Sequence, residues 1–346
     1  MRRYTRTLVA AALMATLVSG TAGWASGSAQ QPVTGPPPGS AAWRDDGSLG
    51  RALPDPQDAT PAQVAAFFGA LSDTQQQALT TRHPSVVGNL DGAPVQLRYR
   101  ANKLAAQKDP RYARLAEPGR QIIAFDPRGR GTVAEVYGDL LTARHVSVVV
   151  PGSDIDAGTY DRERDPYGTP AGMATSLRAA TGGRTAVVAW AGYTTPVGVG
   201  LDAATGELAE AGAARLARFT TGLTAAGVET PALFCHSYGS VVCGLAAPRA
   251  AASDIVVFGS PGMRAGSVAA LRTDARVWAA KDPSDWISKV PNVEFLGLGH
   301  GPDPAAEGFG ARRVPARTAH GHTGYFAPGT DSLRAFAAIA TGGDVR

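Results

Sequence analysis

Long hydrophobic runs, lysine and cysteine are all scarce in this 346-residue chain. Beyond its first twenty residues no apolar run is long enough to cross a bilayer, so the mature chain is predicted to have no transmembrane span. Only four lysines are present, and the net charge of +4 is not gathered in a dense basic cluster with interleaved aromatics, which argues against nucleic acid as a partner. The two cysteines limit the chain to one internal disulfide.

The N-terminus resembles an export signal. Arg2 and Arg3 precede an apolar stretch at residues 8–18, and small residues follow at Ala25 and Ala29. A basic start, a short apolar stretch and a small-residue cleavage site predict a secretory signal peptide over residues 1–29 and a secreted, extracellular protein. An uncleaved N-terminal anchor is the alternative, although the stretch is shorter than the ~20 residues that a span requires.

Three segments are expected along the chain. The signal peptide is followed by a Pro/Gly-rich stretch, residues 30–59, that predicts a flexible or polyproline linker. Residues 60–346 then form one domain, which begins with helical sequence introduced by Thr60 and Pro61.

Strands alternate with helices from residue 121 onward. Two adjacent strands come first, and helical stretches separate most of the later ones, which predicts an α/β fold whose central sheet begins antiparallel and continues parallel. The strands are expected at residues 121–125, 132–137, 145–150, 185–190, 232–235, 255–258, 276–279 and 312–314.

A serine lies where a strand meets a helix. The sequence Cys-His-Ser-Tyr-Gly-Ser at residues 235–240 follows the apolar strand at 232–235 and opens a helix of small residues. A serine at such a tight turn, with Gly239 two positions later, is typical of the nucleophile of a serine hydrolase. Cys235 replaces the usual first glycine, and its small side chain still fits the turn.

Activating a serine requires a base and a carboxylate that orients it. In chain order the acid comes after the serine, and the strand at 276–279 is followed by Asp282 and Asp285. Asp285 is the preferred acid, because Asp282 precedes Pro283 and is expected to form a turn. The base comes last, and the loop before the final helix offers His320 and His322.

Backbone amides are the expected oxyanion donors. The amide of Tyr238 follows the serine, and the amide of Ser153 lies in the loop after the strand at 145–150. Trp190 and Tyr193, at the end of the next strand, line the pocket or belong to the core. The charged run at residues 154–165 lacks the spacing of a calcium loop and is expected to be solvated, so no metal is predicted.

The two cysteines are predicted to pair. Cys235 lies two residues below the serine on a strand, and Cys243 lies six residues beyond it on a helix that runs back down. With rises of ~3.3 Å per strand residue and ~1.5 Å per helix residue, the two positions lie at comparable depth. Two buried thiols are the alternative.

Taken together, these segments resemble the secreted α/β-hydrolases of high-GC Gram-positive bacteria that were long catalogued as a domain of unknown function. The resemblance covers roughly residues 60–340 and implies an α/β-hydrolase fold and a triad of Ser237, Asp285 and His322, without implying a substrate. The matching segments are residues 83–94, 101–102, 125–127 with Gly129 and Gly131, 148–152, 189–193, 236–240, 285–287, 298–299, and 321–322 with Tyr325.

The function expected from these residues is that of a secreted serine hydrolase without a cofactor. It would hydrolyse carboxylic esters, such as lipid or small-molecule acyl esters, through an acyl-enzyme. An amidase, peptidase or acyltransferase could use the same triad, and a non-catalytic envelope or binding protein could use the same scaffold.

Overall fold

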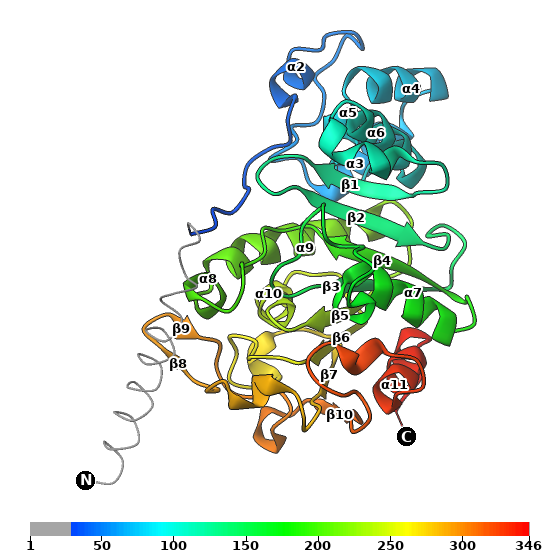
Figure 1. The fold of residues 1–346 in the computed structure, drawn as a ribbon. Helices are drawn as coiled ribbons and strands as arrows, with labels where there is room; N and C mark the ends of the chain where they lie inside the picture. The colour runs from blue at the N-terminus through cyan, green and yellow to red at the C-terminus, as the bar shows by residue number, and fades with distance from the viewer. Residues whose placement is uncertain (1–28, 346) are drawn as a thin grey trace.

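A central sheet of eight strands organises the computed structural model, which describes residues 29–345 (Figure 1). The strand order is β1-β2-β4-β3-β5-β6-β7-β10. β1 and β2 pair antiparallel, β2 pairs antiparallel with β4, and every later pairing is parallel, as predicted. The strands are β1 Ile122–Asp126, β2 Thr132–Tyr137, β3 His145–Val150, β4 Thr185–Ala191, β5 Ala232–His236, β6 Asp254–Phe258, β7 Arg276–Ala280 and β10 Arg312–Val314.

The inner strands are buried on both faces, as parallel strands covered by helices must be. β3 and β4 are rich in valine and alanine, and all seven residues of β4 are buried. Alternate residues of β3 enter different clusters: Val148 and Val150 pack on one face of the sheet and Val149 packs on the other. The unbroken apolar runs that predicted these strands therefore reflect two separate cores.

Helices cover both faces of the sheet (Figure 1). α9 (Glu207–Ala225) and α10 (Gly239–Ala246) contribute to the first cluster, whereas α7 (Pro170–Ala180) and α11 (Asp331–Ala340) contribute to the second. This layering leaves the edge at the carboxyl ends of the parallel strands open to the loops that carry the candidate site.

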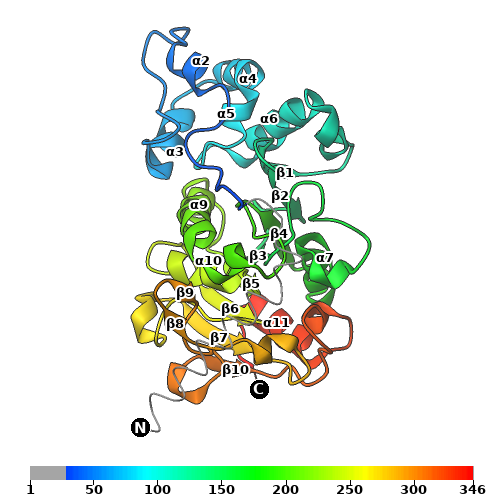
Figure 2. The ribbon, with the colours of Figure 1, turned by 60° about the vertical axis from the view of Figure 1, so that its left-hand side comes forward.

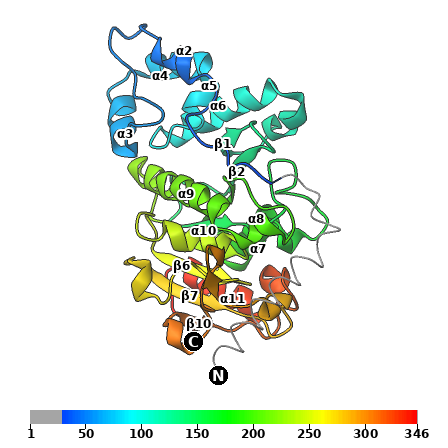
Figure 3. The same ribbon diagram turned by 90° about the vertical axis from the view of Figure 1, so that its left-hand side faces the viewer.

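The N-terminal helices gather at the β1 end of the sheet, as Figures 2 and 3 show. Capping boxes at Thr60 and Ser72 start two of these helices, in which a glutamine three residues later returns the hydrogen bond. They share a third apolar cluster. The helices are α3 Pro61–Gly69, α4 Asp73–Arg82, α5 Pro84–Val87 and α6 Val95–Gln107.

The stretch at residues 30–59 is not simply a linker. It contains the short helix α2 (Ser40–Arg44), whose Trp43 is fully buried in the N-terminal cluster and donates from its indole nitrogen to the Pro54 oxygen at 2.7 Å. Packed structure therefore begins before residue 60, because one large aromatic side chain outweighs the Pro/Gly-rich composition around it. The predicted signal peptide falls almost entirely on residues 1–28, which lie outside the described residues.

Two further elements lie at the open edge of the sheet. α8 (Leu201–Ala204) follows β4, and a hairpin of β8 (Glu294–Phe295) and β9 (Leu298–Gly299), which the sequence did not predict, follows β7. Between residues 29 and 345, no helix combines the length and apolar character needed to cross a bilayer.

Candidate active site

Ser237 occupies a sharp turn between β5 and α10. Its φ of 53° lies in the left-handed region that non-glycine residues rarely adopt, and such outliers gather at functional sites. The Ser237 amide donates to the Phe258 oxygen of the neighbouring strand at 3.0 Å, which fixes the turn to the sheet.

Two glycines allow the chain to pack closely around this serine. A Cβ atom on Gly152 would lie 2.6 Å from the Ser237 Cβ and 3.0 Å from its Oγ. A Cβ atom on Gly239 would lie 2.6 Å from the Val150 oxygen. Both positions therefore need glycine, and the loop after β3 lies directly against the serine.

His322 bridges Ser237 and Asp285. Its Nε2 lies 2.9 Å from the Ser237 Oγ, and its Nδ1 lies 2.9 Å from Asp285 Oδ1 and 3.1 Å from Oδ2. Because a carboxylate can only accept, Nδ1 carries the proton and Nε2 is left to accept from the serine hydroxyl. The structure thus brings together the three residues that the sequence selected, in the tautomer that a general base requires.

Asp285 is held as a buried carboxylate. Burial alone would raise its pKa, but the hydrogen bond and charge of His322, with the Ile287 amide at 2.9 Å, lower the pKa below its ordinary value. The Tyr325 hydroxyl also donates to Asp285, at 2.8 Å. Burial, followed by the charge of Asp285, raises the pKa of Tyr325 and keeps that hydroxyl protonated. Sequence reasoning assigned no role to Tyr325, although it lies three residues after His322.

Asp282 and His320, the alternatives to Asp285 and His322, lie elsewhere in the same loops. Asp282 accepts from the Gly321 amide at 2.6 Å and from the Ser284 hydroxyl at 2.5 Å, so it holds the loop that carries His322. This agrees with its predicted role as a turn residue. His320 is exposed and adopts a positive φ of 58°.

The amides of Tyr238 and Ser153 are available as donors. Neither makes a hydrogen bond to another group within residues 29–345. Tyr238 precedes α10 as its N-cap residue, so its amide is one of the unsatisfied donors at a helix start. Ser153 follows Gly152, which packs against Ser237.

Trp190 and Tyr193 do not line a pocket at the serine; they are core residues. Both are 2% exposed, and their rings stack with centroids 5.9 Å apart in the cluster beneath α9. The Tyr193 hydroxyl donates to the Pro151 oxygen at 2.8 Å. An aromatic residue at a strand end packs in a core as readily as it binds a ligand, and here α9 covers both rings. Tyr193 instead supports the loop that carries Ser153.

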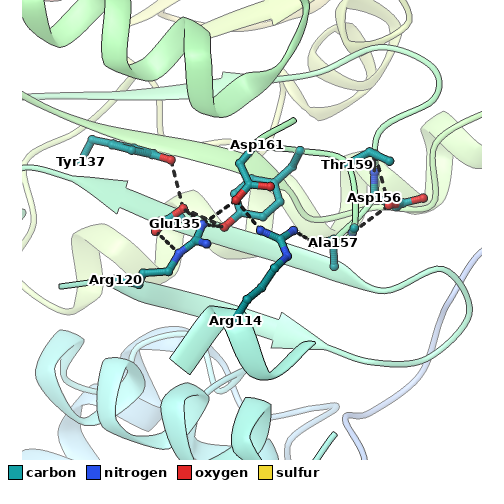
Figure 4. A network of polar contacts seen from close by, with 10 residues as sticks. Arg114, Arg120, Glu135, Tyr137, Asp156, Ala157, Thr159 and Asp161 are labelled. Carbon is teal, nitrogen blue, oxygen red and sulfur yellow. Dashed lines mark hydrogen bonds and ion pairs between the residues drawn. The ribbon is translucent and has the colours of Figure 1, made fainter. Parts of the chain in front are cut away.

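A polar network fastens the same loop to β2 and to the segment that precedes β1 (Figure 4). Glu135 on β2 accepts from the Nε and Nη2 atoms of Arg120, at 2.8 and 2.7 Å, and from the Tyr160 hydroxyl at 2.7 Å. Asp161 binds Arg120 at 2.8 Å and also pairs with Arg114. This network therefore holds the end of the loop that begins beside Ser237.

The charged run at 154–165 is therefore only partly solvated, contrary to expectation. Asp156 pairs with Arg130 at 2.9 Å, and Asp161 belongs to the network above. The arginines that neutralise these carboxylates are distant in sequence, so the run itself could not reveal them. Across the described part of the chain, no group of three or more His, Cys, Asp and Glu side chains is arranged to hold a metal ion.

Cys235 and Cys243 form a disulfide, as predicted from their comparable expected depth below Ser237. It joins β5 to α10 on either side of Ser237. The staple therefore fixes both arms of the turn that presents the serine.

Replacing Cys235 and Cys243 together by alanine is expected to lower the free energy of unfolding by about 2–3 kcal/mol, the loop-closure value for so short a loop. Urea unfolding with and without reductant measures this loss of stability. Reductant should not change the unfolding midpoint of the double variant. An unchanged midpoint for fully reduced wild type, verified by thiol titration, would contradict this expectation.

His236 supports the backbone of His322. Its Nε2 donates to the His322 oxygen at 2.7 Å, and its ring stacks on Phe258 with centroids 5.1 Å apart. Burial, with a smaller contribution from His322, lowers the pKa of His236 to about 3. His236 therefore stays neutral wherever the protein is folded.

The low pKa of His236 makes folding sensitive to acid. An unfolded histidine binds a proton near pH 6.5 and the folded one only near pH 3, so this contribution is complete above pH 6.5 and is lost as the pH falls toward 3. At most it amounts to about 5 kcal/mol. The variant His236→Gln, which keeps a donor, should lose less melting temperature than wild type between pH 7 and pH 4. Equal losses in the two proteins would refute this.

Comparison with known proteins identifies the fold. The family model described as Alpha/beta hydrolase matches residues 126–295, which run from the end of β1 through the turn at Ser237 to β8. The chain has the α/β-hydrolase fold. The α/β-hydrolase fold that the resemblance implied is thereby confirmed, and the matched part of the chain contains Ser237 and Asp285 but not His322.

The chain is also similar to two curated proteins. Two uncharacterized proteins of Mycobacterium tuberculosis, from strains H37Rv and CDC 1551, are each 28% identical over 375 residues, covering 84% of this chain. The chain spans only 57% of the length of these relatives.

Solved structures of hydrolases are also similar to parts of the chain. Dienelactone hydrolase from Anabaena variabilis is 17% identical, covers 61% of this chain and 90% of its own, and has a TM-score of 0.40. Esterase PE8 is 17% identical, covers 60% of this chain and 96% of its own, and has a TM-score of 0.39.

Proposed function

We propose that this α/β-hydrolase is a serine hydrolase that cleaves carboxylic esters through an acyl-enzyme. The observation that carries the proposal is the relay from Asp285 through His322 to the Ser237 Oγ, with heavy-atom separations of 2.9 Å at both ends. These separations are those of a nucleophile, a base and an orienting acid.

In the first half-reaction the Ser237 Oγ attacks the acyl carbonyl carbon while His322 Nε2 takes the hydroxyl proton. The amides of Tyr238 and Ser153 would then donate to the oxyanion of the tetrahedral intermediate. Collapse of the intermediate breaks the bond to the alcohol oxygen, which receives the proton from His322 and leaves. Ser237 is now esterified.

In the second half-reaction a water molecule replaces the alcohol. His322 takes a proton from this water as its oxygen attacks the acyl carbon, and returns a proton to the Ser237 Oγ as the acid leaves. Asp285 stabilises the positive charge on His322 in both halves and stays ionised, as its lowered pKa favours.

Secretion is part of the same proposal. The N-terminal sequence has the pattern of a signal peptide, and a buried disulfide is typical of proteins that fold in an oxidising compartment.

A fluorophosphonate probe tests the proposal, because it labels a serine only when that serine is activated. Wild type should be labelled, and Ser237→Ala should not be. Ser284→Ala is less suitable as a control, because Ser284 contacts Asp282 and Gly321. Ser267→Ala serves instead, because the Ser267 hydroxyl accepts from the Ala270 amide and contacts no residue of the candidate triad. Absence of labelling in wild type, or equal labelling of Ser237→Ala, would remove the enzyme proposal.

The reaction class is then tested with matched substrates. p-Nitrophenyl esters should be hydrolysed, and peptide p-nitroanilides should be turned over far more slowly or not at all. Faster cleavage of the anilides would make the protein an amidase.

A further inference from the structure

Large apolar side chains are exposed almost exclusively at one place. Of the eight large hydrophobic residues exposed within residues 29–345, three lie in residues 197–201 and four in residues 286–296. The eighth, Leu141, precedes β3 at the opposite edge of the sheet. We call the two segments together the apolar rim.

The two halves of the apolar rim are joined. His300, directly after β9, donates from Nε2 to the Ala203 oxygen of α8 at 2.7 Å. Arg264 donates to the Gly297 oxygen of the hairpin at 2.7 Å, and a Cβ atom on Gly206, just after α8, would lie 2.4 Å from the Arg264 Cζ. The rim is therefore one continuous surface, and Figure 1 shows α8 and the β8–β9 hairpin on the same side of the molecule.

The apolar rim also reaches the candidate active site. Trp286, half-exposed and next to Asp285, packs its ring against His322 with centroids 4.6 Å apart. A ligand on the rim would therefore lie beside the base that contacts Ser237.

The tip of the hairpin is costly for folding. Leu296 and Gly297 form its two-residue loop, and both have positive φ, 50° and 79°. Such a loop favours asparagine or glycine, whereas a leucine is strained there. Leu296 is also 87% exposed, so burial within the chain does not offset that strain. The apolar tip is better explained by contact with something outside the chain.

The charge of the apolar rim indicates what that contact is. Residues 197–201 contain no charged side chain, and residues 286–296 contain one of each sign, Lys289 and Glu294. A surface with large apolar groups and no net charge complements hydrocarbon without a charge requirement, and an exposed apolar patch of this kind marks an interaction site.

We propose that the apolar rim docks onto the hydrocarbon of an aggregated acyl lipid and delivers a long acyl ester to Ser237. This inference rests on the proposed function, and it narrows the substrate class to water-insoluble esters in micelles or bilayers. Leu296, Phe295 and Val199 enter the lipid, while Trp286 borders the path to the serine.

Two rim variants and one matched control test the proposal. Leu296→Asn gives the loop a residue suited to positive φ, so the hairpin should fold at least as well as in wild type. Val199→Thr, in the other half of the apolar rim, keeps the branched shape of the side chain and makes it more polar. Leu141→Asn removes an exposed leucine at the opposite edge. Thermal unfolding verifies that all three fold.

Binding is measured without turnover. In a Ser237→Ala background, cosedimentation with phosphatidylcholine vesicles should fall about tenfold for Leu296→Asn, the factor expected when one leucine side chain no longer leaves water. A smaller loss is expected for Val199→Thr, and no change for Leu141→Asn. The same full chain is used throughout, so the N-terminal segment contributes equally.

Turnover is measured in the active background on two esters. For Leu296→Asn the rate on micellar p-nitrophenyl palmitate, divided by the rate on dissolved p-nitrophenyl butyrate, should fall about tenfold, following the loss of binding. Leu141→Asn should leave the ratio unchanged.

The outcomes separate the two proposals. If butyrate is hydrolysed while both rim variants bind vesicles and use palmitate like wild type, the lipid proposal is overturned and the serine hydrolase stands. If no ester is hydrolysed but vesicle binding depends on Leu296, the surface stands and the hydrolase proposal fails. If sedimentation shows a wild-type dimer that Leu296→Asn dissociates, and vesicles do not bind, the occupant is a second copy and the lipid proposal is overturned.

Discussion

The His322→Ala variant is expected to hydrolyse esters about a million-fold more slowly than wild type, as loss of the base does in a serine triad. Without the imidazole, no group within residues 29–345 that hydrogen-bonds to the Ser237 Oγ is left to take its proton. The loss should appear in kcat for p-nitrophenyl butyrate, and the oxyanion amides should leave a small residual rate.

His320→Ala is the matched control, two residues away in the same loop. Its side chain is exposed, and its removal should change kcat less than tenfold, since only its positive φ shapes the loop. If instead His320→Ala abolished turnover and His322→Ala retained it, the base would be assigned to the wrong histidine.

Asp285→Asn is expected to lower kcat about ten-thousand-fold while leaving the packing of the site intact. The carboxylate fixes the proton of His322 on Nδ1. An amide can instead donate to Nδ1 and favour the tautomer with its proton on Nε2, which cannot accept from Ser237. Steady-state kinetics at pH 7 to 9 measure the loss.

Asp282→Asn separates this effect from a general disturbance of the loop. Asp282 holds the Gly321 amide and the Ser284 hydroxyl, so its change should reduce kcat moderately, by about tenfold, through misplacement of His322. Equal losses from the two variants would mean that Asp285 acts through loop geometry and not through the tautomer of His322.

Much of the sheet could be predicted because its strands are buried on both faces. Apolar, β-branched runs such as β3 fit only a strand that is buried on both faces. All eight strands were predicted within one residue of their observed ends. The turn at Ser237 was visible because it needs small residues at fixed positions. The loop holding His320 and His322 could also be predicted, but the pattern alone did not choose between the two histidines; the resemblance chose His322.

What could not be predicted depends on contacts between distant segments. Trp190 and Tyr193 end a strand near the site, and only the path of α9 decides that they are covered. Trp43 packs in the N-terminal apolar cluster and so anchors the Pro/Gly-rich stretch around it. The β8–β9 hairpin has two residues in each strand and a leucine where a turn residue is usual, so neither periodicity nor turn chemistry could reveal it.

The separation of Ser237 and His322 along the sequence determines the order in which they are synthesised and brought together. A chain made from its N-terminus completes β5 and the serine turn first, and the histidine follows 85 residues later. Under the proposed function, Ser237 becomes an activated nucleophile only after the segment that carries His322 has been synthesised and has packed against the sheet. A nascent chain that has not yet reached His322 is therefore expected to leave Ser237 unreactive.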